Sequence, residues 1–169
     1  MPQAENKTNI KQHWQIIAVI LIFIVGLSLR IANLGQLPLN EVEAALALDA
    51  KGLLTGQEQF SQPFYTIITS TLFWLFEDHN FFARFVPAII GSLLILAPWV
   101  MGRTFSTRNK MLLSFGLAFD PALVAASKTA GSPIIAVASL FFLLILFHKK
   151  KPVGVGIVLA LLFMSGPAA

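Results

Sequence analysis

The sequence has 169 residues, contains no cysteine and is poor in charged residues. Without cysteine the chain can form no disulfide, no thiolate metal site and no cysteine nucleophile. Only 12% of its residues are charged, whereas a soluble globular domain averages about 25%. With 56% hydrophobic residues and a mean hydropathy of +0.77, the composition predicts an all-α integral membrane protein.

The short motifs of soluble enzymes are also missing. The sequence has no Gly-rich phosphate loop, no Gly-x-Ser-x-Gly and no His-Glu-x-x-His. No internal repeat, low-complexity tract or soluble linker divides it. We therefore expect one membrane domain over residues 1–169 and find no support for a soluble-type enzyme.

Five apolar stretches predict transmembrane helices, at about residues 14–32, 82–101, 111–127, 133–147 and 153–164. The last two are short beside the roughly 20 residues that a bilayer requires. Lys7 and Lys11 precede the first stretch as in a signal peptide, but no convincing small-residue cleavage site follows, which favours an uncleaved anchor. The sequence closes on Ser-Gly-Pro-Ala-Ala without a polar tail, so we expect a truncated gene or a fragment.

Residues 33–81 form a loop that does not suit lipid, and it is either an ordinary connector or a carboxylate-bearing surface element. Glu41–Leu54 combines acids with apolar residues at helical spacing, which predicts a short amphipathic helix with Asn40 as its N-cap. Phe64–Phe76 is apolar but has only 13 residues, which fits a re-entrant or interfacial helix better than a span. The loop therefore carries one or two amphipathic surface helices.

Lysine and arginine positions set the expected orientation. If Phe64–Phe76 does not cross, eight Lys and Arg residues lie on the side of the N-terminus, and four lie on the other side with six of the eight acids. The positive-inside rule then places the N-terminus in the cytoplasm and the acidic loop outside, in a bacterial-type cell membrane. The basic residues behind the isoelectric point near 9.7 are thus explained as topology signals, so we expect no nucleic-acid partner.

Glu41 and Glu43 are the candidate catalytic carboxylates. Two positions apart on a helix they are rotated by about 200°, so they cannot act as a pair from one face. Either one of them faces the membrane surface as a base or metal ligand while the other is solvated, or both place negative charge in a first helical turn.

Three further residues have two interpretations each. Asp120 lies inside a predicted span, where an ionisable group is a functional candidate, or it accepts backbone donors at a helix broken by Pro121. Lys128 binds a phosphate as a point charge, or snorkels toward the membrane surface. His79, within Glu-Asp-His-Asn, ligates a metal with a neighbouring acid, or is simply solvated.

Four motifs occur in a specific order, and each alone is weak. They are Leu29-Arg30 with Leu34-Gly35, then Leu39-Asn40-Glu41-Val42-Glu43-Ala44, then Gln62-Pro63-Phe64, and finally Arg84-Phe-Val-Pro-Ala followed by Phe119-Asp-Pro121 and Ser127-Lys128. Over about residues 25–165 this order resembles the N-terminal part of the C-type glycosyltransferases, the membrane enzymes of the protein O-mannosyltransferase and aminoarabinose-transferase type.

The resemblance implies inverting transfer of a hexosyl or pentosyl group from a polyprenyl-phosphate donor at the outer membrane face. Glu41 or Glu43 would act as the base or position a divalent metal. The lipid phosphate would be held by basic side chains, with Arg30, Arg84 and Lys128 as the candidates.

Two departures from the family pattern weigh against catalysis. Where the family has Asp in its first-loop motif, this sequence has Val42 in one register and Asn40 in the other. The acid that usually follows a few residues after Ser127-Lys128 is missing. The chain is thus expected to be a glycosyltransferase or a fragment of one, or else a non-catalytic small membrane subunit of the same ancestry in a larger complex. A transporter or channel comes third, because one Asp and no repeat give it little support.

Overall fold

The computed structural model describes residues 2–56, 61–102 and 105–166, and every regular element among them is a helix. The elements are α1 (Pro2–Ile31), α2 (Glu41–Leu54), α3 (Pro63–Phe76), α4 (Asn80–Leu93), the 3₁₀ turn η1 (Leu94–Leu96), α5 (Ala97–Val100), α6 (Thr107–Phe119), α7 (Pro121–Ser127), α8 (Pro133–His148) and α9 (Pro152–Met164). The all-α prediction is confirmed.

Two helical stretches are long and apolar enough to cross a membrane. They are His13–Ile31 within α1, and Asn80–Val100, in which α4, η1 and α5 follow one another. A third candidate exists if α6 and α7, which are bent by 55°, form one span. Helices α3, α8 and α9 are shorter apolar helices. By length and composition the described residues thus hold two or three candidate spans, whereas the sequence led us to expect five.

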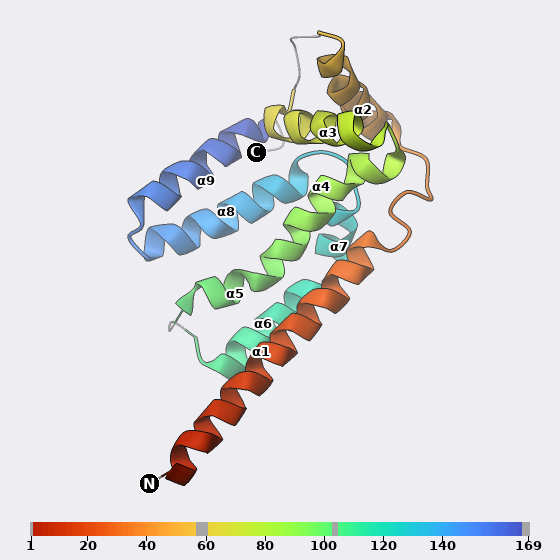
Figure 1. Cartoon of the computed structure of the whole chain (residues 1–169). Helices are drawn as coiled ribbons and strands as arrows, with labels where there is room; N and C mark the ends of the chain where they lie inside the picture. Colours follow the sequence, from red (N-terminus) through yellow and green to blue (C-terminus); the bar gives the residue numbers. More distant parts are fainter. Residues whose placement is uncertain (1, 57–60, 103–104, 167–169) are drawn as a thin grey trace.

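Helix α4 is the centre of the molecule (Figure 1). It packs against α1 and α7 on one side and against α8 on another, and α8 and α9 form a helical hairpin. Helices α2 and α3 pack together beyond the C-terminal end of α1, at the end where α4 begins (Figure 1). The two helices expected in the loop therefore lie across one end of the bundle.

Proline marks where several helices begin. Helices α3, α7, α8 and α9 each carry it at the first position, where its missing N–H costs no helical hydrogen bond. Pro121 follows Asp120, whose side chain accepts a hydrogen bond of 2.9 Å from the Leu123 N–H. Asp120 is therefore the N-cap of α7, and of its two interpretations the structure shows the backbone-capping one.

Candidate functional site

The first turn of α2 is held by a capping box, as the sequence predicted for Asn40. The Asn40 side chain accepts a hydrogen bond of 2.8 Å from the Glu43 N–H, and the Glu43 carboxylate accepts one of 3.1 Å from the Asn40 N–H. Such reciprocal bonds satisfy two backbone donors that a helix start leaves free. The box fixes the Glu43 carboxylate at the start of α2.

Arg84, on α4, meets this carboxylate side-on. Its Nε donates to Glu43 Oε1 at 2.9 Å and its Nη2 to Oε2 at 2.7 Å. The two side chains are only 9% and 5% exposed. A paired, two-bond geometry of this kind is the strongest form of carboxylate recognition by arginine.

The remaining donors of Arg84 bind the segment between α1 and α2. Nη1 donates to the carbonyl oxygens of Leu34 and Leu37 at 3.1 and 2.9 Å, and Nη2 donates to that of Pro38 at 3.0 Å. All five N–H groups of the guanidinium are thereby used. Arg84 fastens both α2 and the segment that precedes it to α4.

The Glu43 carboxylate accepts a fourth hydrogen bond, from a residue distant in the sequence. The Ala130 N–H, in the turn between α7 and α8, donates to Oε1 at 2.8 Å. Together with Arg84 and Asn40, this makes four hydrogen bonds to the two oxygens, and a carboxylate offers about four lone-pair sites. The Glu43 carboxylate is therefore saturated by the protein itself.

The same bonds set the protonation of Glu43. Burial raises the pKa of a carboxyl, but the hydrogen bonds from Arg84, Ala130 and Asn40 outweigh it and lower the pKa of Glu43 from 4.5 to about 2. Glu43 is thus ionised at neutral pH. A base is effective when its pKa lies near the working pH, so this carboxylate is poorly matched to removing a hydroxyl proton.

Glu41 lies on the same turn but on the outside. Its side chain is exposed, whereas that of Glu43 is buried, in keeping with two positions of a helix that face different ways. Across the described residues, no group of three or more His, Asp or Glu side chains is placed to hold a metal ion. With Glu43 saturated as well, the residues present do not fit a divalent metal at this site.

Arg30 lies fully buried at the break between α6 and α7. It donates to the carbonyl oxygens of Leu117 and Ala118 at 2.9 and 3.1 Å, to that of Gly26 at 3.0 Å and to Ser127 Oγ at 3.3 Å. The last carbonyls of a helix have no partner within it, and here the guanidinium supplies one. Arg30 thus joins α1 to the broken helix pair.

The three basic residues expected to hold a lipid phosphate are used separately. Arg84 binds Glu43 and three carbonyls of the segment before α2, and Arg30 binds the α6–α7 break. Lys128 Nζ donates to the Ala32 carbonyl at 3.1 Å. Each is committed to a different set of backbone oxygens. The structure does not bring them together as one phosphate site.

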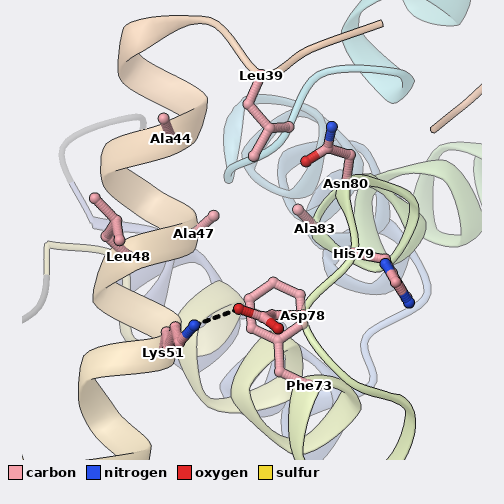
Figure 2. A pocket seen from close by; sticks show the side chains of 10 residues that line it. All are labelled: Leu39, Ala44, Ala47, Leu48, Lys51, Phe73, Asp78, His79, Asn80 and Ala83. Atoms are coloured by element: carbon pink, nitrogen blue, oxygen red, sulfur yellow. Dashed lines mark hydrogen bonds and ion pairs between the residues drawn. The ribbon is translucent and has the colours of Figure 1, made fainter. Parts of the chain in front are cut away.

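A cavity that sequence reasoning missed lies among α2, α3 and α4, with a volume of about 290 Å³ (Figure 2). Its lining residues are Leu39, Ala44, Ala47, Leu48, Lys51, Phe73, Asp78, His79, Asn80 and Ala83. Lys51 and Asp78 form an ion pair at its edge, and the His79 ring points away from it (Figure 2). His79 is exposed, with Nε2 3.9 Å from a Glu77 carboxylate oxygen.

No family model, curated protein or solved structure matches this chain. In the residues that the structure describes, fold and site define an all-helical class with two or three candidate membrane spans, in which the Glu43 carboxylate of α2 is neutralised by Arg84 of α4. The resemblance to the C-type glycosyltransferases stays a prediction.

Proposed function

We propose that this chain is a non-catalytic membrane subunit with the N-terminal architecture that resembles the C-type glycosyltransferases, and that it packs within a larger membrane complex. The observation that carries this proposal is the saturation of Glu43 by Arg84, Ala130 and Asn40. A carboxylate with no free lone pair cannot take a proton or bind a metal without breaking the contacts that hold α2.

Exposed apolar helix surface supports the packing role. Only 11% of the candidate span in α1 is buried within the protein, compared with 61% of Asn80–Val100. Helix α9 has no buried residue at all in the described part of the chain. These faces are available to lipid or to helices of another subunit, since both are apolar partners.

We also propose five spans, formed by α1, by α4 with α5, by α6 with α7, by α8 and by α9. At a rise of 1.5 Å per residue, the 16 residues of α8 and 13 of α9 reach about 24 and 20 Å, so the bilayer would thin or their flanking lysines would snorkel. This arrangement keeps the N-terminus in the cytoplasm and α2 outside.

Cysteine labelling tests this topology without background, because the chain has no cysteine of its own. Single variants at exposed positions are treated with a membrane-impermeant maleimide on intact cells. Val42→Cys and Thr129→Cys should be labelled, while Arg108→Cys and Lys150→Cys should react only after the membrane is opened. Labelling of Lys150→Cys on intact cells would contradict the five-span arrangement.

Purification in a mild detergent tests the function. Co-purification with a larger membrane complex at fixed stoichiometry, without sugar transfer from a polyprenyl-phosphate donor, is the result that we expect. Sugar transfer by the purified chain alone would overturn the proposal.

Glycosyl transfer is the second candidate, and the exposure of Glu41 favours it, since this acid is free to face a substrate. Transfer that the wild-type chain performs and Glu41→Gln loses would establish it. Transfer that persists in a Glu41→Gln/Glu43→Gln double variant would exclude both acids as the base. The single Glu41→Gln variant is the cleaner probe, because Glu43→Gln also removes a structural contact.

A further inference from the structure

The cavity among α2, α3 and α4 has an apolar wall and one charged edge (Figure 2). Leu48, Ala47 and Phe73 contribute apolar surface, and Lys51 and Asp78 meet at the edge. Its volume of about 290 Å³ is near the lower end of the roughly 300–1,000 Å³ of small-molecule pockets. A site of this size suits a lipid headgroup with its first methylenes rather than a whole lipid.

The charges at this edge are balanced and weakly held. Lys51 and Asp78 are 57% and 52% exposed, and exposed ion pairs of this kind are weak, so their members can change partners easily. A ligand with a single charge would pair with one of them and leave the other unneutralised. A zwitterionic ligand would pair with both, exchanging one ion pair for two.

In the five-span arrangement proposed above, on which this step rests, the cavity lies at the outer membrane surface. Asp78 lies two residues before the candidate span Asn80–Val100, and Lys51 reaches Asp78 from α2. In the last turn of α3, shortly before Asp78 in the sequence, Trp74 and Phe76 are exposed. Tryptophan is enriched at the level of lipid headgroups, where an amphipathic ring is favoured.

We propose that this cavity binds the headgroup of a zwitterionic phospholipid from the surrounding bilayer. The lipid phosphate pairs with Lys51, the headgroup cation pairs with Asp78, and the first methylenes lie against Leu48 and Phe73. This inference goes beyond the proposed function and does not depend on whether the chain is catalytic, because neither Glu41 nor Glu43 lines the cavity.

Lipid titration of the purified full chain, followed by native mass spectrometry, tests the proposal. The probes are phosphatidylethanolamine, anionic phosphatidylglycerol and an uncharged glycosyl diacylglycerol, all with the same acyl chains. We expect one phosphatidylethanolamine to bind more tightly than either of the others. Equal or tighter binding of the anionic or the glycosylated lipid would overturn the headgroup assignment.

Matched variants locate the binding site. Ala47→Leu fills the cavity and should abolish the tight site, whereas Ala45→Leu, on the exposed face of the same helix, should leave it intact. Lys51→Gln and Asp78→Asn should each weaken binding about two- to fivefold, as expected when one exposed ion pair is lost, and Lys150→Gln should not. Binding that is the same in Ala47→Leu and Ala45→Leu would contradict the proposal, and the glycosyl-transfer assays would be unaffected by that outcome.

Discussion

Glu43 Oε2 and Arg84 Nη2 lie 2.7 Å apart, in a side-on pair that joins the start of α2 to α4. The two residues are 41 positions apart, so the pair closes a long loop. Both members of the pair bind further segments. Arg84 donates to carbonyls of the segment between Leu34 and Pro38, and Glu43 accepts a hydrogen bond from the Ala130 N–H in the α7–α8 turn. Removing either partner would leave the other charge buried without compensation, which is far more costly than losing an exposed ion pair.

Replacing Glu43 should therefore destabilise the protein. We expect Glu43→Gln to lower the free energy of unfolding by about 3–5 kcal/mol, because it leaves the Arg84 guanidinium without its counter-charge. Glu41→Gln is the matched control, since this exposed neighbour should change stability by less than about 0.5 kcal/mol. Denaturant unfolding in mixed micelles, followed by tryptophan fluorescence, measures both. Equal losses of unfolding free energy in the two variants would show that the Glu43–Arg84 pair does not stabilise the protein.

The stability of the protein should fall with pH between 4.5 and about 2, because of Glu43. The pKa of Glu43 is lowered from 4.5 to about 2 in the folded protein, so the folded state binds this proton less readily than the unfolded chain. The stabilisation is then complete above pH 4.5 and is lost as the pH falls toward 2. Unfolding measured from pH 6 to pH 2 should show this loss for the wild type, and a smaller one for Glu43→Gln. The same acid dependence in both would assign it to other carboxyls.

Arg30 should not be replaceable by lysine. Arg30→Lys keeps the charge but loses the planar fork that reaches Leu117, Ala118 and Ser127 at once. We expect a loss of about 2 kcal/mol or more in unfolding free energy, since buried carbonyls are left without a donor. Ser127→Ala, which removes a single hydroxyl partner, should cost about 1 kcal/mol. An Arg30→Lys protein as stable as the wild type would contradict this role.

Replacing two glycines by alanine tests the helix packing, because we expect opposite changes in stability at the two positions. A Cβ at Gly91 would collide with the Ser127 side chain, because α4 and α7 approach closely there. Gly91→Ala should therefore destabilise the protein by about 1–3 kcal/mol. At Gly116 nothing lies within 4 Å of such a Cβ, so Gly116→Ala should stabilise α6 by about 0.5–1 kcal/mol. Thermal unfolding of the two variants should show shifts in opposite directions.

Local features were predictable from the sequence, because they depend on neighbouring residues. The start of α2 at Glu41 and its cap at Asn40 follow from capping chemistry. The break at Asp120 follows from the proline after it. The all-helical class follows from the apolar composition, which is typical of membrane proteins. In lipid, backbone N–H and C=O groups need hydrogen-bond partners within the protein, and a helix supplies them within one segment.

The two distant partners of Glu43, Arg84 and Ala130, were not predictable in the same way, since they lie 41 and 87 positions away. A signal was present, however. Glu43 shares one helical face with Leu46 and Ala50, and both are buried, so an acid in that stripe had to be paired. The cavity edge formed by Lys51 and Asp78 depends on how α2 packs beside α3 and the connection that follows it, which periodicity does not encode.

The central claim is that Glu43 acts as a structural clamp through Arg84, and a double-mutant cycle tests it most directly. Unfolding free energies are measured for the wild type, Glu43→Gln, Arg84→Gln and the double variant. The contact predicts that the double variant loses less stability than the sum of the singles, with a coupling of about 2 kcal/mol or more. Effects that add within about 0.5 kcal/mol would contradict the clamp.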